Sequence, residues 1–323
     1  MRNSNSLIGF RVDASDSIGF GHVVRCLALA EYMLDYGHDV VFITRDLDKV
    51  KRATGDRYTI MEIENDSADS ILSKVHPRVM VIDLREGGEQ LSEELVSRVS
   101  NVVLISDFPR YVPPLIDIYC FPTFIPLDIE IPASVKVFGG GKYILLRREI
   151  INYIGRSSEV RKDVENITVI LGGGYRKRDE MEVLNTLDNI NYRGEVNLFS
   201  GIFSIKGGLY DFRLKVVKGF KIPYKEISQS DLVICGSGLS LFETLALKKP
   251  AISIPGSRRE EEEVNVLSEM GYCFDGRGDI RHVLCEAIEC FESRKKIVRN
   301  IEGAVDGKGA ERVAKAIDEL VGE

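Results

Sequence analysis

A histidine, an arginine and two glycines lie close together near the start of the chain, in the segment GFRVDASDSIGFGHVVRCLALA. The apolar run Leu7–Val12 predicts a strand, and apolar residues at helical spacing after His22 predict a helix. His22 would then lie at a helix N-terminus, where unpaired backbone N–H groups and the helix dipole can hold an anion beside the imidazole. Gly19 and Gly21 would let the backbone approach a ligand closely. The alternative interpretation is that His22 caps or packs the helix.

A second segment with small and polar residues, GSGLSLFETLALKKP, follows the apolar run Leu232–Cys235. Its residues Gly236, Ser237, Gly238 and Ser240 would expose backbone N–H groups and hydroxyls to a phosphate at the start of a helix. Glu243, one helical turn beyond Ser240, could accept two ribose hydroxyls. The alternative is that Ser240 and Glu243 form an ordinary capping box.

Further candidates come from the ends of other predicted strands. Gly172-Gly173-Gly174 follows the strand Ile167–Leu171 and repeats the pattern of strand, glycine turn and helix. Asp83 and Asp107 follow two apolar runs, at the place where ligands bind in open α/β sheets. Either carboxylate could instead be a cap or a turn residue.

Short apolar runs alternate with helical patterns along the whole chain, which is typical of parallel sheets covered on both faces. The predicted strands are Leu7–Val12, Val40–Thr44, Tyr58–Glu62, Val79–Leu84, Val102–Ser106, Ile118–Phe121, Ile167–Leu171, Val196–Ser200, Leu214–Val217, Leu232–Cys235 and Ala251–Ile254. The predicted helices after the first one are 68–75, 91–99, 180–187, 222–228, one starting near Arg258, and 309–320. This pattern predicts an α/β protein with two Rossmann-like domains and a cleft between them.

The charged, poorly patterned stretch 157–165 is the predicted linker. We therefore expect an N-terminal domain over 1–155, which carries His22, and a C-terminal nucleotide-binding domain over 156–323.

Composition excludes several classes of protein. A net charge of −7 over 323 residues argues against a dedicated nucleic-acid binder. No apolar run approaches the roughly 20 residues of a membrane span, and the polar start MRNSNS is unlike a signal peptide. Six cysteines without close pairs and only four histidines predict neither a disulfide framework nor a metal centre. We expect a cytoplasmic protein that needs no cofactor or metal and does not insert in membranes; the sequence leaves its oligomeric state open.

Three segments resemble one family of enzymes: RVDASDSIGFGHVVRCLALA, GGGKYILLRREI and DLVICGSGLSLFETLALKKPAISIP. They are similar to segments of the nucleotide-sugar hydrolases of pseudaminic acid biosynthesis, which cleave UDP-2,4-diacetamido-2,4,6-trideoxy-β-L-altropyranose to UDP and the free sugar. Proteins described as spore-coat polysaccharide glycosyltransferases share these features, and both groups are related to glycosyltransferases of the B-type fold (GT-B).

The resemblance implies a role for each matching residue. His22 would be the catalytic base, while Gly19, Gly21 and Arg25 would shape the turn around it. The diphosphate would meet Gly236, Ser237, Gly238 and Ser240, and Glu243 would hold the ribose. Further substrate contacts would come from Asp83, Tyr143 and Gly173.

The chain departs from this family at three places. It has Asp83-Leu84-Arg85 where the family has Asp-x-Tyr, Gly173-Gly174-Tyr175-Arg176 where the family has Gly-Gly-x-Asp, and Arg259-Glu260 near an expected Asn-Gln pair. We therefore expect hydrolysis of a nucleotide-activated, N-acetylated deoxysugar, with the exact sugar open. The alternatives are a glycosyltransferase that uses a nucleotide sugar and a non-catalytic nucleotide-sugar binding protein.

Overall fold

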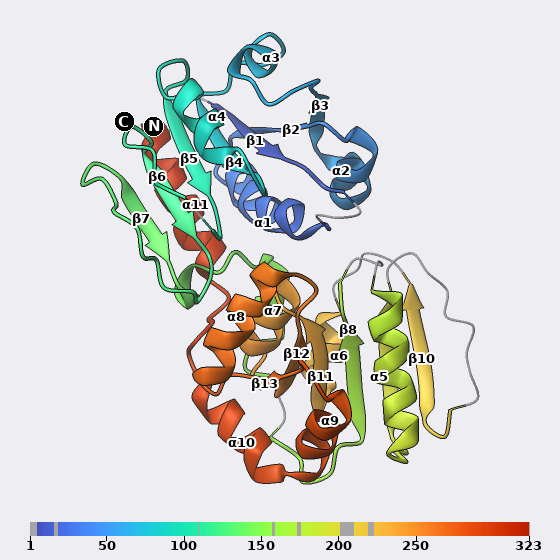
Figure 1. Cartoon of the computed structure of the whole chain (residues 1–323). Helices are drawn as coiled ribbons and strands as arrows, with labels where there is room; N and C mark the ends of the chain where they lie inside the picture. Colours follow the sequence, from blue (N-terminus) through green and yellow to red (C-terminus); the bar gives the residue numbers. More distant parts are fainter. Residues whose placement is uncertain are drawn as a thin grey trace. The chain divides into compact units, whose positions relative to one another are not determined.

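The computed structural model describes residues 5–15, 19–108, 110–156, 159–172, 176–200, 210–218 and 223–322. The chain divides into two compact units (Figure 1), and each is described separately. Unit 1 comprises Met1–Arg148 together with Lys308–Glu323, and unit 2 comprises Glu149–Gly307.

Unit 1 is built on a seven-stranded parallel sheet with the strand order β3-β2-β1-β4-β5-β6-β7. The strands are β1 (Leu7–Val12), β2 (Asp39–Thr44), β3 (Thr59–Glu62), β4 (Val79–Asp83), β5 (Asn101–Ile105), β6 (Ile118–Phe121) and β7 (Lys136–Gly139). The helices are α1 (Gly21–Asp35), α2 (Leu47–Thr54), α3 (Ala68–Leu72), α4 (Gly88–Leu95) and α11 (Gly309–Gly322), with the short 3-10 helices η1 (Gly55–Arg57) and η2 (Gly141–Tyr143). Apolar residues of α1 and α11 form the core on one face of the sheet, and those of α3 and α4 form the core on the other.

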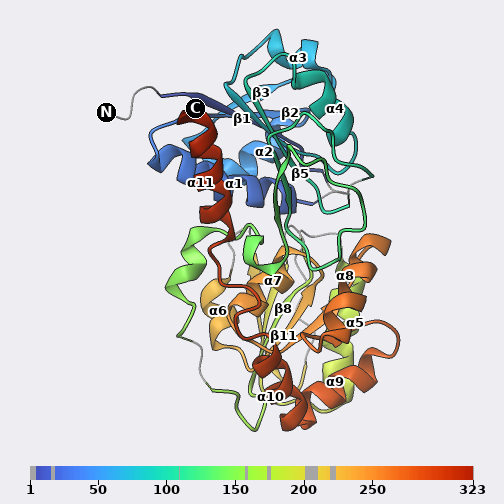
Figure 2. The ribbon, with the colours of Figure 1, turned by 90° about the vertical axis from the view of Figure 1, so that its left-hand side faces the viewer.

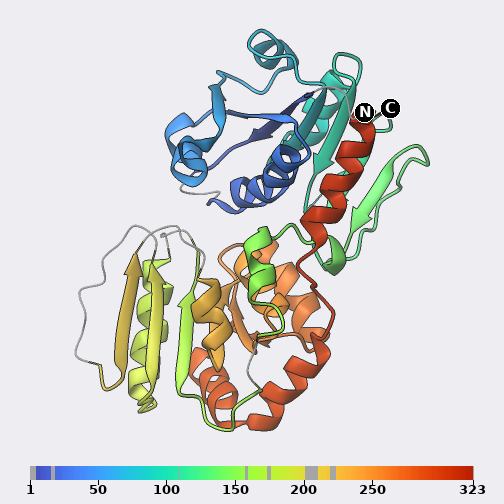
Figure 3. The same cartoon turned by 180° about the vertical axis from the view of Figure 1, so that it is seen from behind.

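Unit 2 is built on a six-stranded parallel sheet with the order β10-β9-β8-β11-β12-β13. The strands are β8 (Asn166–Ile170), β9 (Glu195–Ser200), β10 (Arg213–Lys218), β11 (Leu232–Gly236), β12 (Ala251–Ile254) and β13 (Phe274–Asp275). The helices are α5 (Lys177–Asn189), α6 (Tyr224–Gln229), α7 (Leu239–Ala246), α8 (Arg258–Glu269), α9 (Ile280–Glu289) and α10 (Phe291–Asn300), and η3 (Arg148–Asn152) spans the junction between the units. Figure 3 shows both sheets from behind.

The two sheets repeat one topology. In unit 1 the chain continues from β1 to β2 on one side and returns to β4 on the other, and in unit 2 β8 lies between β9 and β11 in the same way. In open α/β sheets, ligands bind outside the carboxyl ends of the strands at such a reversal of strand order. The described residues that follow β1, β4, β8 and β11 are therefore candidate binding positions.

The two-unit α/β architecture and all the predicted strands are confirmed, with ends that differ by a residue or two. The sequence pattern did not predict α2, α9, α10, β7 and β13. Helix α2 is a short, polar segment, LDKVKRAT, and β13 spans only two residues, so neither carries a clear hydrophobic period.

The predicted domain limits differ from the structure at both ends of the second domain. The first unit ends at Arg148 rather than at residue 155, and the last sixteen residues belong to unit 1 rather than to the C-terminal unit. Figure 2 shows α11 beside α1, and both contribute to the same core. The helix starts close to η2: a Cβ on Gly309 would lie only 2.3 Å from the carbonyl oxygen of Ile144, so this position needs glycine. Farther along, Asp318 pairs with His38 at 2.9 Å.

No helix among the described residues is long and apolar enough to cross a membrane.

Replacing Ile317 with alanine should destabilise unit 1. Ile317 is fully buried in the core that α11 shares with α1, and such truncations cost about 2–5 kcal/mol. Hydrogen exchange followed by mass spectrometry should show faster exchange in β1 and α1 and unchanged exchange in β11 and α7. The exposed Lys315 on the same helix provides the control Lys315→Ala, which should change neither unit. Faster exchange in unit 2 alone would contradict the assignment of α11.

Candidate functional site

His22 lies on the first turn of α1, directly after the loop that follows β1. The N-cap of α1 is Phe20, without a side-chain cap, so His22 is not the capping residue. Its Nδ1 lies 2.7 Å from Oδ1 of Asp83, and its side chain is 18% exposed. Because a carboxylate only accepts hydrogen bonds, a neutral imidazole that bonds to Asp83 carries its proton on Nδ1; Arg25 Nη2, 3.1 Å from the same nitrogen, then donates to Asp83 and not to the ring. Nε2 is then left with a free lone pair, as a general base requires.

Asp83 is the last residue of β4 and is fully buried. Its Oδ1 accepts from His22 and from Arg25 Nη2 at 2.5 Å, and its Oδ2 accepts from Arg25 Nε at 2.5 Å and from the Cys26 thiol at 3.6 Å. Burial alone would raise the pKa of this carboxyl, but the Arg25 guanidinium and His22 outweigh burial and hold that pKa well below its usual value. Asp83 was expected to contact substrate; the structure instead encloses it among protein donors, where it orients His22.

Arg25 links the two carboxylates that follow neighbouring strands. It donates from Nη1 to both oxygens of Asp107, at 2.6 and 2.7 Å, while its other donors hold Asp83. Burial opposes its charge, but Asp107 and Asp83 together raise the pKa of the guanidinium well above its usual value. The carboxyl ends of β4 and β5 are therefore joined through α1 by ion pairs. The sequence indicated both carboxylates, but not that Arg25 connects them.

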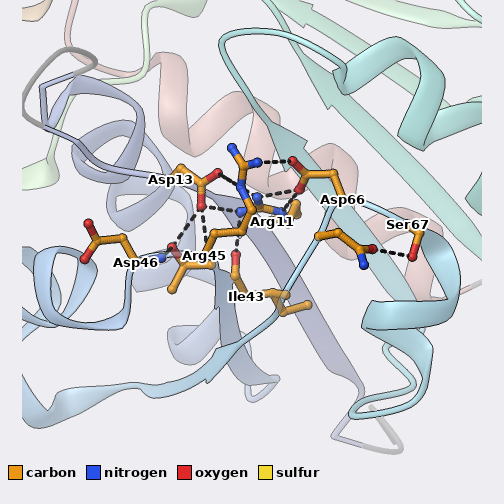
Figure 4. Close-up of polar contacts among 9 residues, drawn as sticks. Arg11, Asp13, Ile43, Arg45, Asp46, Asp66 and Ser67 are labelled. Atoms are coloured by element: carbon orange, nitrogen blue, oxygen red, sulfur yellow. Dashed lines mark hydrogen bonds and ion pairs between the residues drawn. The ribbon is translucent and has the colours of Figure 1, made fainter.

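A second group of ion pairs follows β1 and β2, as Figure 4 shows. Arg11 is fully buried and binds Asp13 through both Nη atoms, at 2.7 and 2.6 Å, and Asp66 through Nε at 2.7 Å. Asp13 also accepts from the Thr44 hydroxyl and from the backbone and side chain of Arg45. Burial raises the pKa of Asp13, but Arg11 and its other donors lower it to about 2. These contacts fasten the start of the segment that leads from β1 to His22.

The turn before α1 depends on a glycine. Gly19 has a φ of 76° and its N–H donates to the carbonyl of Ser15 at 2.7 Å, a backbone conformation that other residues rarely adopt. Gly21 is the exposed first residue of α1. Both glycines therefore lie in the turn that leads to His22.

In unit 2, the segment Gly236–Ser240 follows β11, which lies beside β8 where the strand order reverses. Gly236 ends β11, and Gly238 is the N-cap of α7, which has no side-chain cap. Ser240 is thus already inside the helix, so the capping-box alternative for Ser240 and Glu243 is wrong. Ser237 is buried, and its hydroxyl lies 2.7 Å from that of Ser253. The first backbone N–H groups of α7 are available to an anion.

Two residues that the resemblance assigns to the substrate make contacts within the protein. Glu243 is only 3% exposed and accepts a hydrogen bond from the Tyr224 hydroxyl at 3.2 Å, so its carboxylate lies inside unit 2. Tyr143, in η2, stacks edge-to-face against Phe138 with ring centroids 5.2 Å apart and packs against the core that α11 completes. Tyr143 therefore has a packing role in unit 1. Gly173 lies outside the described residues.

Within the described part of the chain, no group of three or more His, Cys, Asp or Glu side chains is arranged to hold a metal ion.

The sequence matches no protein-family model. It is 24% identical over 336 residues to the uncharacterized protein MJ1062 of Methanocaldococcus jannaschii, an alignment that covers 90% of this chain and 67% of MJ1062. It is 21% identical over 209 residues to the spore coat polysaccharide biosynthesis protein SpsG of Bacillus subtilis, covering 59% of this chain and 61% of SpsG. The chain thus spans about two thirds of the length of these relatives and is distantly related to SpsG.

Three solved structures have a similar fold. MurG of Acinetobacter baumannii superposes with a TM-score of 0.68 at 12% identity, over 97% of this chain and 99% of MurG. The calicheamicin glycosyltransferase CalG4 gives 0.66 at 15% identity, over 100% and 99%. UGT2 of Phytolacca americana, solved with UDP-2-fluoro-glucose and pterostilbene, gives 0.62 at 12% identity, over 98% and 100%. The two sheets of this chain therefore have the GT-B fold, as expected.

Replacing Asp83 with asparagine should lower the free energy of unfolding by about 3–5 kcal/mol at pH 7, because it removes the carboxylate that binds Nε and Nη2 of the buried Arg25, while Asp107 reaches only Nη1. The folded-state pKa of Asp83 is depressed, so its stabilisation is complete above its usual pKa of 3.8 and is lost as the pH falls below that value. Urea unfolding should therefore show a difference between variant and wild type that shrinks below about pH 4.

The exposed Asp56 supplies the matched variant Asp56→Asn, for which we expect little change at any pH. A difference for Asp83→Asn that is constant from pH 7 to pH 3 would show that the charge of Asp83 is not what stabilises the fold.

Proposed function

We propose that this protein is an enzyme that hydrolyses a UDP-activated, N-acetylated deoxysugar to UDP and the free sugar. The observation that carries the proposal is the pairing of His22 with a fully buried, ionised Asp83 at the strand-order reversal of unit 1. This pairing uses Nδ1 and leaves Nε2 of a partly exposed ring to accept a proton, which supports a catalytic role over packing alone. The GT-B fold, which UGT2 shares in a complex with UDP-2-fluoro-glucose, supports a nucleotide sugar as the ligand.

In the proposed reaction His22 Nε2 takes a proton from water as the water oxygen attacks the anomeric carbon. A new carbon–oxygen bond forms, and the bond from the anomeric carbon to the diphosphate breaks with its electron pair on the leaving group. Asp83 stabilises the resulting imidazolium and keeps the ring in one orientation, while Arg25 keeps Asp83 ionised. Asp83 and Arg25 are thus positioning residues, and His22 is the catalytic residue.

Unit 2 would bind the nucleotide. The backbone N–H groups and hydroxyls of Gly236, Ser237, Gly238 and Ser240 would receive the diphosphate, and the dipole of α7 would stabilise its charge. For Glu243 to hold the ribose, the ribose hydroxyls must reach a carboxylate that is 3% exposed and already accepts a hydrogen bond from Tyr224. No metal or organic cofactor is required by this scheme.

The proposed sugar follows from the resemblance of three sequence motifs and from the distant relation to SpsG. The motifs similar to the hydrolases of pseudaminic acid biosynthesis favour an N-acetylated deoxysugar, and the distant relation to SpsG, a spore coat polysaccharide biosynthesis protein, favours synthesis of a surface sugar. Arg85, Tyr175 and the Arg259-Glu260 pair replace residues of that family, so a related sugar rather than the same one fits the proposal.

Glycosyl transfer is the second candidate, and the likeness to the calicheamicin glycosyltransferase CalG4 favours it. The same base would then take a proton from an acceptor hydroxyl instead of from water. Both reactions use His22 in the same way, so only the identity of the acceptor separates them.

Replacing His22 with asparagine should lower kcat by about 10²–10⁴-fold, because the amide has a similar size but cannot accept the proton. UDP affinity should stay within about twofold of wild type, since the proposal places the nucleotide in unit 2. Release of UDP from a panel of UDP-sugars measures turnover, and calorimetric titration measures affinity. The exposed His76 of the same unit gives the control His76→Asn, with normal turnover expected. Full activity of His22→Asn would refute the base, and a wild type that binds but never turns over would favour a binding protein.

Reaction in ¹⁸O-water distinguishes hydrolysis from transfer. With no added acceptor, we expect release of UDP and of a sugar that carries ¹⁸O at its anomeric carbon, because attack at carbon leaves the phosphate oxygens unchanged. Mass spectrometry of both products gives the position of the label. Label in UDP would mean attack at phosphorus, and turnover only after an alcohol or lipid acceptor is added would establish the transferase.

A further inference from the structure

Arg176 extends across the carboxyl edge of the sheet in unit 2. The residue immediately precedes α5, at the end of the segment that follows β8. Its Nη1 donates to the carbonyl of Ile254, at the end of β12, at 2.5 Å, and its Nη2 donates to the carbonyl of Pro255 at 3.1 Å. Because β11 lies between β8 and β12, the side chain spans the end of β11. The Arg176 side chain therefore lies at the carboxyl ends of the strands where the strand order reverses.

Two glycines lie against this guanidinium. A Cβ on Gly256 would lie 3.3 Å from Cζ and Nε of Arg176, closer than most side chains tolerate, whereas a Cβ on Gly236 would lie at an ordinary contact distance of 3.5 Å from Nη1 and only 3.0 Å from the carbonyl oxygen of Leu171. Gly236 is also the first of the residues proposed to meet the diphosphate. The cation of Arg176 therefore lies directly beside the proposed phosphate-binding turn.

The charge of Arg176 is only partly balanced. Asp179 accepts from Nε at 2.7 Å, but this carboxylate is 37% exposed, whereas the Arg176 side chain is 15% exposed. The nearby Glu260 accepts from the backbone N–H of Gly256 at 2.7 Å. A guanidinium has five N–H groups, of which the bonds above use three, and the other two have no partner among the described residues. An anion placed at the turn can accept from them.

We propose that Arg176 recognises the diphosphate of the ligand and makes the site selective for nucleoside diphosphates over nucleosides, without a divalent cation. This inference rests on the proposed function and adds to it the group that balances the leaving-group charge. The arginine is fixed by two backbone carbonyls before the ligand arrives, so little side-chain freedom is lost on binding. The resembling family has a carboxylate at this position of its Gly-Gly-x-Asp motif, so the charge is reversed in this chain.

The test compares UDP, UMP and uridine by calorimetric titration in EDTA, on wild type and on Arg176→Gln. We expect the variant to lose about tenfold or more in UDP affinity, less in UMP affinity, and at most about twofold in uridine affinity, because only phosphate contacts are removed. Arg176→Lys keeps the charge but not the fork, and it should recover part of the loss. Arg178, exposed on the same helix, provides the control Arg178→Gln, which should bind all three ligands normally.

Three other results of the titrations would contradict the role of Arg176 or the proposed function. Equal losses for UDP and uridine in Arg176→Gln would show that the arginine only holds β12 in place, and Arg176→Lys checks this in a variant that keeps the charge. Unchanged or tighter UDP binding would show that the guanidinium does not contact phosphate or that it blocks the turn; either result overturns the inference but leaves the proposed function standing. A wild type that binds neither UDP nor uridine would overturn both.

Discussion

The buried ion pair of Arg25 and Asp83 is the interaction on which the arrangement around His22 depends. A carboxylate that is fully enclosed at the end of β4 would be neutral unless a cation paired with it. Arg25 supplies that cation in fork geometry, and its Nη1 also binds both oxygens of the partly exposed Asp107. Because Asp83 then stays ionised, it can hold Nδ1 of His22 and leave Nε2 as the base. Removal of Arg25 would leave the buried Asp83 carboxylate without its cation.

The two units use the same topology for different chemistry. At the reversal in unit 1, ion pairs between Arg25 of α1 and the carboxylates that follow β4 and β5 fix one imidazole. At the reversal in unit 2, the backbone at Gly238 is open, and Arg176 lies against Gly236 at the end of β11. The first arrangement suits a proton transfer, which needs a defined pKa and orientation. The second suits an anion, which needs many donors and little steric bulk.

The sequence was sufficient for the architecture because strands buried on both faces leave continuous apolar runs. VMVID in β4 and LVICG in β11 are examples. The glycine-rich turns after strands indicated which edge of each sheet holds the candidate binding residues. It was not sufficient for the end of the chain. The helix at 309–322 was predicted, but an amphipathic pattern indicates only that one face is covered, not which sheet covers it. Its return to unit 1 depends on a close approach at Gly309, which no local pattern reveals.

The sequence predicted which residue types lie at the candidate site, but not which of them contact one another. His22, Asp83 and Asp107 were identified from their places after strands, yet Asp83 was assigned to substrate because burial of a carboxylate cannot be read from spacing. Glu243 and Tyr143 show the same limit: residues at positions that match a motif can face the protein interior. Arg25 bonds to the Asp83 carboxylate and Arg176 to the Ile254 carbonyl, each at the end of a strand 58 or more residues away in the sequence.

The buried group around Arg11 explains why so polar an edge is compatible with a stable sheet. Arg11 is fully buried inside β1, and its desolvation is offset because Asp13, Asp66 and the carbonyl of Ile43 all accept hydrogen bonds from it. Asp13 in turn receives donors from β2 and from the residue after it, so the ends of neighbouring strands are tied together by charge. The segment that leads to Gly19 and His22 thus leaves the sheet from a fixed point. The same kind of interaction therefore anchors both ends of this segment, through Asp13 at its start and Asp83 at its end.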